Sequence, residues 1–280
     1  MINRLLTVYL QLFVGILFLL LFAAGCRTDA FTSYWRDSYI TIDGDQSDWQ
    51  GRLWVPESEN IAIGIMNDES NLYLTLSSSD RNTIMQVMRL GFTVWFDPKG
   101  GKKEVFGIKY PVGMAGVGMR TIGDRGRSRD QMPDLHEEIQ SLKESQIWAE
   151  ILGPEKDDIA RIPVMDSSGI QVGIGYSAYG HLVYELTIPL ERTSDSPHAI
   201  DTSPGATIGI GFETGKIDFA AMRRSRGGNS GMPGGMPGGR GRPGGMRGGG
   251  RPGGMRGGGM RGAMPEPFKY WARVTLATGS

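Results

Sequence analysis

Short segments in which apolar and polar residues alternate recur along most of this chain. The clearest ones place apolar side chains at every second position: Ile61, Ile63 and Ile65, then Leu72, Leu74 and Leu76, then Phe92, Val94 and Phe96. The pattern returns over residues 105–110, 172–176, 182–190, 207–213 and 270–276. A period of two with one apolar face is typical of a strand that packs on one side. Many such strands, separated by turn residues, predict an all-β antiparallel β-sandwich.

One segment follows the period of a helix instead. Residues 133–148 place Leu135, Ile139 and Leu142 at helical spacing, with acidic residues early and Lys143 later. This arrangement predicts one surface α-helix that packs on a sheet. Residues 153–169 show no pattern that assigns them to a strand or a helix.

A Gly/Arg/Met-rich tract precedes the last predicted strand. Residues 227–262 contain 19 glycines, and the nonapeptide Arg-Pro-Gly-Gly-Met-Arg-Gly-Gly-Gly occurs at 242–250 and again at 251–259. So much glycine cannot bury enough apolar surface to offset the entropy of ordering. We therefore predict that 223–267 is a long disordered loop inserted before the final strand. Its nine arginines and one acid give a charge of +8, so the rest of the neutral chain carries −8.

The N-terminus has the features of an export leader. Arg4 precedes an apolar run over residues 12–24, small residues follow, and Cys26, the only cysteine, comes directly after them. The order of these features is typical of a signal peptide, and the cysteine resembles the lipidated residue of bacterial lipoproteins. The alternative is an uncleaved membrane anchor over residues 5–25. Either alternative places the rest of the chain outside the cytoplasm.

These features divide the chain into three parts. We predict a lipoprotein signal peptide at 1–25, a tether at 26–38 and a single β-sandwich domain at 39–276 that carries the 223–267 insertion. With one cysteine the chain can form no internal disulfide, which is consistent with an exported protein whose cysteine is lipid-modified.

Four short motifs, in order, resemble those of family 9 carbohydrate-binding-module-like domains, which are related to DOMON domains. Residues 40–49 read Ile-Thr-Ile-Asp-Gly-Asp-Gln-Ser-Asp-Trp and resemble the opening strand, turn and tryptophan of that family. The other three are Asn-Leu-Tyr-Leu at 71–74 with Asp80 nearby, the segment 91–98 and the segment 182–190. The resemblance covers roughly residues 39–276 and implies a β-sandwich that binds sugars in some members.

Three aspartates in the first motif are candidate metal ligands. Asp43, Asp45 and Asp48 carry hard oxygen donors close together in sequence, which indicates a candidate calcium site, although the set lacks the spacing of an EF-hand. The alternative is that the aspartates bond to nearby backbone amides, Gly44 permits a turn, and Trp49 fills the core. The sequence indicates no other cofactor.

Three aromatic residues are candidate ligand contacts, because a sugar site needs exposed rings flanked by polar groups. Trp95, Trp271 and Tyr73 each lie on the face of their strand opposite its core-facing residues. The alternative is that each packs beneath the predicted helix or a long loop.

The sequence favours a non-catalytic function. Residues 175–179 lack the second glycine of a nucleophile elbow, and His136-Glu137-Glu138 lacks the second histidine of a zinc-protease helix. The leading hypothesis is an envelope lipoprotein that binds a glycan or a partner near the membrane. One alternative is an assembly protein whose Arg/Gly-rich loop binds anionic polymers rather than nucleic acid, which export makes an improbable partner. Another is a haem-binding electron-transfer module with Met and His axial ligands.

Overall fold

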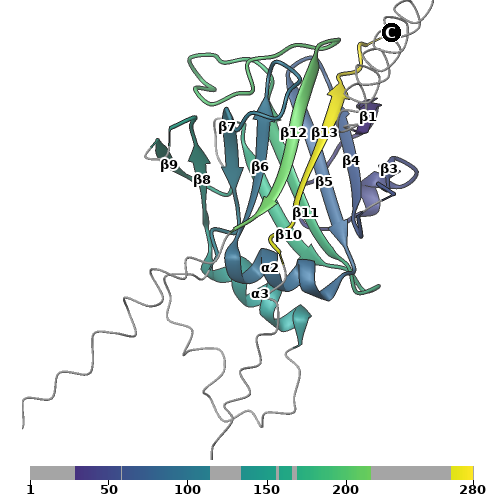
Figure 1. Cartoon of the computed structure of the whole chain (residues 1–280), viewed down its shortest axis with the longest axis vertical. Coiled ribbons are helices and arrows are strands. Elements are labelled where there is room, and N and C mark those ends of the chain that lie inside the picture. The colour runs from purple at the N-terminus through teal and green to yellow at the C-terminus, as the bar shows by residue number, and fades with distance from the viewer. Residues whose placement is uncertain are drawn as a thin grey trace, which may run out of the picture. The chain divides into compact units, whose positions relative to one another are not determined.

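The alternating segments form two sheets that pack face to face (Figure 1). The structure, a computed structural model, describes residues 29–57, 59–113, 134–155, 158–165, 169–215 and 266–279. The predicted leader at 1–25, Cys26 and all but the last two residues of the 223–267 tract lie outside the described residues. Within the described ranges, no helix is both long and apolar enough to cross a membrane.

Seven of the described strands make the first sheet. Their order is β1 (Asp29–Thr32), β13 (Lys269–Thr275), β12 (Thr207–Thr214), β6 (Phe92–Asp97), β7 (Phe106–Lys109), β8 (Trp148–Leu152) and β9 (Ile159–Pro163). All neighbours pair antiparallel except β1, which runs parallel to β13. The prediction of a final strand that closes the sheet after the Gly/Arg/Met-rich tract is confirmed, because β13 lies between β1 and β12.

The second sheet contains the remaining described strands. Its order is β10 (Gln171–Tyr176), β11 (Leu182–Pro189), β5 (Asn71–Ser78), β4 (Ala62–Asn67) and β2 (Tyr34–Trp35), while β3 (Leu53–Trp54) also pairs with β4. Only β2 and β4 run parallel in this sheet. The predicted two-sheet β-sandwich is therefore confirmed.

Strand register decides which side chains enter the core between the sheets. Val94 of β6 pairs with Phe212 of β12 and with Ile108 of β7, and all three side chains are fully buried. Leu74 of β5 reaches the same core from the other sheet. Because successive side chains of a strand alternate in direction, Trp95 points to the outer face of the seven-stranded sheet.

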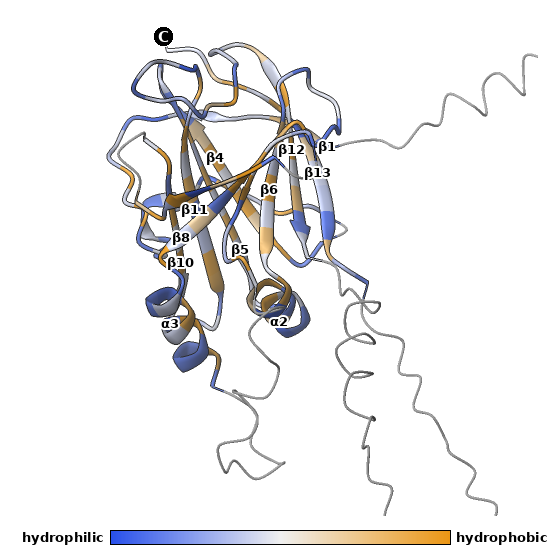
Figure 2. Ribbon diagram, turned by 90° about the vertical axis from the view of Figure 1, so that its left-hand side faces the viewer, coloured by the Kyte–Doolittle hydropathy of each residue, from blue (hydrophilic) through white to orange (hydrophobic). Residues whose placement is uncertain are grey.

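Two α-helices among the described residues lie near one end of the sandwich (Figure 1). The first is α2 (Arg81–Leu90), beside β6 and β12, and the second is α3 (Leu135–Ser145), which packs on β10. Each carries hydrophobic residues on one side and hydrophilic residues on the other (Figure 2). The predicted helix at 133–148 is confirmed as α3.

Helix α2 corrects the prediction of a single helix. It begins after Asp80, whose side chain accepts a hydrogen bond from the backbone N–H of Thr83 at 2.8 Å, and it ends before Gly91. Its buried residues include Ile84 and Val87, which are spaced by three positions. An N-cap aspartate, helical spacing and a terminal glycine are sufficient signals for a helix.

The N-terminal segment corrects the prediction of a tether at 26–38. Asp29–Thr32 forms β1 in one sheet and Tyr34–Trp35 forms β2 in the other, so this stretch belongs to the sandwich. Tyr270 fixes β1 through a hydrogen bond from its hydroxyl to Asp29 Oδ2 at 2.8 Å. A parallel edge strand this short leaves almost no periodicity for sequence analysis to detect.

Candidate functional site

Glu185 of β11 joins two of the sequence motifs at one point. Its Oε2 accepts hydrogen bonds from the backbone N–H groups of Asp43 and Gly44 at 3.0 and 2.7 Å. Its Oε1 accepts a hydrogen bond from Trp49 Nε1 at 2.7 Å. The carboxylate therefore fastens the Asp-Gly turn and the tryptophan to the six-stranded sheet.

The turn at Gly44 has no room for a side chain. Gly44 has a φ of 86°, and a Cβ there would stand 2.5 Å from the backbone nitrogen of Gly175. Burial raises the pKa of Glu185 to about 7, although the N–H donors from Trp49, Gly44 and Asp43 favour the charged form. The motif and its glutamate thus explain how the chain folds here, and they leave no free carboxylate for a ligand.

Trp49 lies in a second, smaller core on the outer face of the six-stranded sheet. Its side chain is fully buried and packs with Ile40, Ile42, Met66 and Tyr73. This confirms the prediction that Trp49 belongs to the core. Because the segment from Ile40 to Trp49 packs here, it covers this part of the outer face of the six-stranded sheet.

The three candidate calcium ligands do not assemble into a site. Asp43 Oδ1 accepts from the backbone N–H of Asp45, Asp45 Oδ1 accepts from that of Ser47, and Asp48 Oδ2 accepts from that of Thr41. Among the residues that the structure describes, no group of three acidic, histidine or cysteine side chains could hold a metal ion. These aspartates bond to backbone amides in the turn, as the alternative to the calcium hypothesis predicts.

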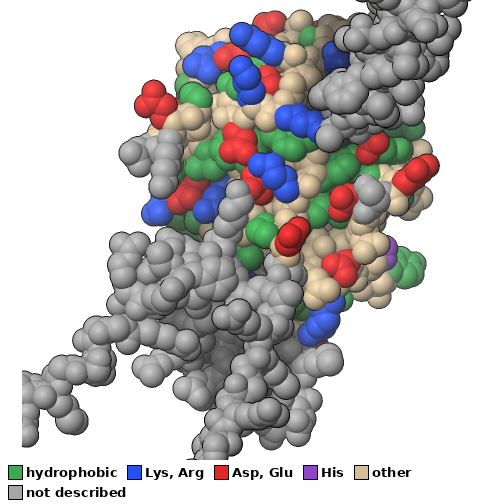
Figure 3. All heavy atoms as spheres, in the orientation of Figure 1, with side chains coloured by type: hydrophobic (Ala, Val, Ile, Leu, Met, Phe, Trp, Pro, Cys, Tyr) green, Lys and Arg blue, Asp and Glu red, His purple; other side chains and the backbone are tan. Residues whose placement is uncertain are grey.

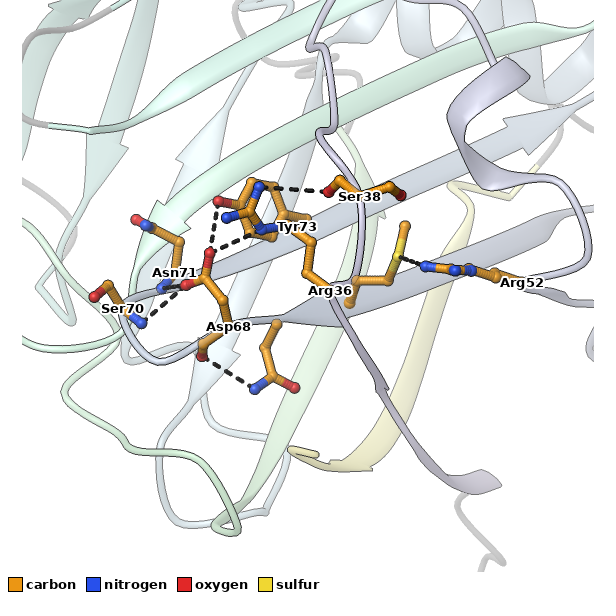
Figure 4. Close-up of polar contacts among 9 residues, drawn as sticks. Arg36, Ser38, Arg52, Asp68, Ser70, Asn71 and Tyr73 are labelled. Atoms are coloured by element: carbon orange, nitrogen blue, oxygen red, sulfur yellow. Dashed lines mark hydrogen bonds and ion pairs between the residues drawn. The ribbon is translucent and has the colours of Figure 1, made fainter. Parts of the chain in front are cut away.

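Tyr73, predicted as a ligand contact, makes its contacts with neighbouring side chains of the protein (Figure 4). Its hydroxyl donates to Asp68 Oδ2 at 3.0 Å, and the Arg36 guanidinium lies 5.0 Å from the centre of its ring. Arg36 Nε also contacts Asp68 Oδ2 at 2.9 Å. Burial, and then the charge of Asp68, raise the pKa of Tyr73 to about 12. The ring is buried and its hydroxyl is already hydrogen-bonded, which favours the alternative that Tyr73 has a structural role.

The other two predicted aromatic residues meet on the outer face of the seven-stranded sheet. Trp95 of β6 and Trp271 of β13 both pair with Gly211 of β12, so the three residues form one row across the strands. Trp95 pairs on its other side with Gly107 of β7. At the usual strand spacing the two tryptophan Cα atoms stand about 10 Å apart. We call these four residues the tryptophan row.

Both indoles of the tryptophan row lie over the neighbouring glycines. A Cβ at Gly107 would stand 2.6 Å from Cε3 of Trp95, and a Cβ at Gly211 would stand 2.5 Å from Cε2 of Trp271. Any larger residue at either glycine would collide with the ring. Trp95 is half-buried and Trp271 is 9% exposed, so Trp95 presents the more accessible ring.

Charged side chains flank the tryptophan row. Lys269 of β13 and Glu213 of β12 lie two positions along their strands from the row. Lys269 Nζ contacts Glu104 Oε1 at 2.7 Å and Glu213 Oε2 at 3.1 Å. Hydrophobic side chains gather over the middle of this face, with acidic and basic side chains between them (Figure 3). Aromatic rings beside charged and polar groups are the combination that a sugar site requires.

Comparisons with known proteins find similarity at the level of structure only. No family model matches the chain, and no curated protein matches it. Two similar solved structures are family 9 carbohydrate-binding modules from Caldicellulosiruptor kristjanssonii, one in complex with glucose and one with cellotriose. The glucose complex is 11% identical, with 69% of this chain and 81% of that chain covered and a TM-score of 0.31. The cellotriose complex is 13% identical, with 70% of this chain and 80% of that chain covered and a TM-score of 0.30.

Proposed function

We propose that this protein is a non-catalytic glycan-binding protein and that the outer face of the seven-stranded sheet is its binding face. The tryptophan row carries this proposal. Two indoles in one row, each over a glycine and flanked by charged groups, offer apolar ring surface next to hydrogen-bonding partners. The opposite sheet is less suited, because residues around Trp49 already pack on its outer face.

Trp95 is the central contact of this proposal. We expect Trp95→Ala to weaken glycan binding by about tenfold or more, which is the effect of truncating an aromatic anchor at a binding surface. Gly107→Ala should also weaken binding, because the new methyl group displaces the Trp95 ring without removing it. The measurement is the affinity of the purified protein for glycans selected on an array.

Tyr179→Ala is the matched control, since Tyr179 is 91% exposed and lies in the turn between β10 and β11. It should bind as the wild type does. An equal loss in Trp95→Ala and Tyr179→Ala, or an array on which no glycan binds, would contradict the proposal. A variant that lacks residues 227–262 should retain binding; loss of binding there would favour the Arg/Gly-rich tract as the binding element.

We further propose that the protein is anchored by lipid on Cys26 outside the cytoplasm. The charged start, the apolar run and the small residues before Cys26 support this location. Cys26→Ala should release the protein from membranes into the soluble fraction, which fractionation and immunoblotting would measure. Continued tight membrane attachment of that variant would instead favour a helical anchor over residues 5–25.

A further inference from the structure

An open hollow lies on the same outer face, next to the tryptophan row. It has a volume of about 380 Å³ and is lined by Ala30, Phe31, Thr32, Thr207, Arg273 and Thr275. Arg273 follows Trp271 by two positions on β13, so both side chains belong to one face and their Cα atoms stand about 7 Å apart. One ligand can therefore contact the tryptophan row and this hollow together.

Arg273 is an exposed cation without an ion pair to any described residue. It pairs across the strands with Gly209 of β12 and Ala30 of β1, neither of which has a polar side chain. On the other side of Trp271, Lys269 is already paired with two glutamates. The two sides of the tryptophan row thus differ in charge, and Arg273, which has no ion pair to a described residue, lines the hollow.

Three threonines contribute hydroxyl groups to the lining of this hollow. Thr207 and Thr275 pair across β12 and β13, and their Oγ1 atoms lie 3.0 Å apart. Thr32 pairs with Thr275 from β1. A guanidinium and several hydroxyls in one hollow can donate hydrogen bonds to the oxygens of an anionic group.

The loop from β6 to β7 brings more cations to this end of the sheet. Asp97 is buried, and its carboxylate accepts hydrogen bonds from the backbone N–H groups of Lys99 and Lys103, each at 3.0 Å. The carbonyl of Gly101 lies so close to Gly209 of β12 that a side chain at Gly209 would collide with it. The loop is therefore held against the strand that carries Thr207.

Three exposed lysines belong to this loop. None of Lys99, Lys102 and Lys103 has an ion pair to a residue in the described ranges. Basic side chains gather at the upper end of this face, with some acidic ones among them (Figure 3). Together with Arg273, these lysines favour a positive potential at the end of the sheet where the threonine hydroxyls line the hollow.

From this arrangement we propose that the glycan is acidic and that its anionic substituent, a carboxylate or a sulfate ester, binds Arg273 in this hollow. The inference rests on the proposed function, because the sugar ring lies on the tryptophan row while the substituent extends toward Arg273. Arg273 donates paired hydrogen bonds to the anion, the threonine hydroxyls add further donors, and the lysine loop supplies attraction over a longer range.

The test compares ligands that share a backbone and differ in charge. The probes are tetragalacturonate, its fully methyl-esterified form and a sulfated oligosaccharide of equal length, each titrated into the purified protein. We expect the acid to bind at least about tenfold more tightly than the ester, with an affinity that falls as salt rises. Arg273→Ala and Arg273→Gln should lower the affinity for the acid to that for the ester, and so remove this preference.

Arg161→Ala is the matched control, because Arg161 is an exposed arginine on β9 of the same sheet, paired with Glu150. It should keep the preference for the acid. A stronger response to the sulfated probe identifies sulfate as the anion, and a stronger response to tetragalacturonate identifies a carboxylate. Equal affinities for acid and ester, or a preference that survives in both Arg273 variants, would overturn the inference.

Failure of this inference is distinguishable from failure of the proposed function. If neutral glycans bind, Trp95→Ala abolishes that binding and charge has no effect, the proposed function stands and the acidic ligand is wrong. If no probe and no array glycan binds, both are wrong.

Discussion

Glu185→Ala is expected to lower the free energy of unfolding by about 3–5 kcal/mol. The substitution leaves the N–H groups of Asp43, Gly44 and Trp49 without their shared acceptor. Each buried donor that loses its partner costs about 1–3 kcal/mol. The measurement is chemical denaturation of the purified protein, followed by tryptophan fluorescence and circular dichroism.

Glu185→Gln separates the hydrogen bonds from the packing of the side chain. Its single amide oxygen can accept from the two backbone groups, but its NH₂ then faces the Trp49 indole N–H, donor against donor. We expect a smaller loss of about 1–3 kcal/mol. In a Trp49→Phe background, which has no indole N–H, the same change should cost less. Equal costs in both backgrounds would mean that the Glu185–Trp49 bond does not stabilise the fold.

Trp49→Ala is expected to have a comparably large effect, about 3–5 kcal/mol of lost stability, because it empties the centre of the smaller core. The indole packs directly on Gly64 of β4, where a Cβ would stand 2.6 Å from ring atom Cε3. The same indole donates a hydrogen bond to Glu185 at 2.7 Å. Thermal and denaturant melts measure the loss.

Tyr39→Ala provides the comparison for Trp49→Ala within the same segment. Tyr39 is 80% exposed, so its truncation should change the free energy of unfolding by less than about 0.5 kcal/mol. If Trp49→Ala has the same stability as the wild type and Tyr39→Ala is less stable, the assignment of Trp49 to the smaller core is refuted.

The sequence predicts much of the sheet architecture because strand periodicity is a local signal. Alternation around Val94 and Ile210 marks which side chains enter the core, and register then places them opposite one another. The same alternation placed Trp95 and Trp271 on outward positions. It could not predict that they share a row, because that depends on the pairing of both strands with Gly211.

Other features depend on contacts between distant parts of the chain. In the sequence, Glu185 is one polar residue within a predicted strand. Its role as the acceptor for the turn at Gly44 depends on a contact between residues 141 positions apart. Tyr73 has the same alternation as Trp95, yet Arg36 and Asp68 enclose it. The hollow at Arg273 is formed in part by residues of β1, and that strand is too short to have a recognisable period in the sequence. Helix α2, by contrast, is predictable from local signals, namely the N-cap Asp80 and Gly91 after its last turn.

The central claim is that a glycan contacts the tryptophan row. Nuclear magnetic resonance of the tryptophan indole N–H groups, during titration with an array-selected oligosaccharide, tests this most directly. Assignment uses the single variants Trp95→Phe, Trp271→Phe and Trp49→Phe. We predict that the Trp95 signal shifts most, that Trp271 shifts with it, and that the buried Trp49 signal stays in place. Saturable binding that leaves the Trp95 signal unmoved would contradict the account.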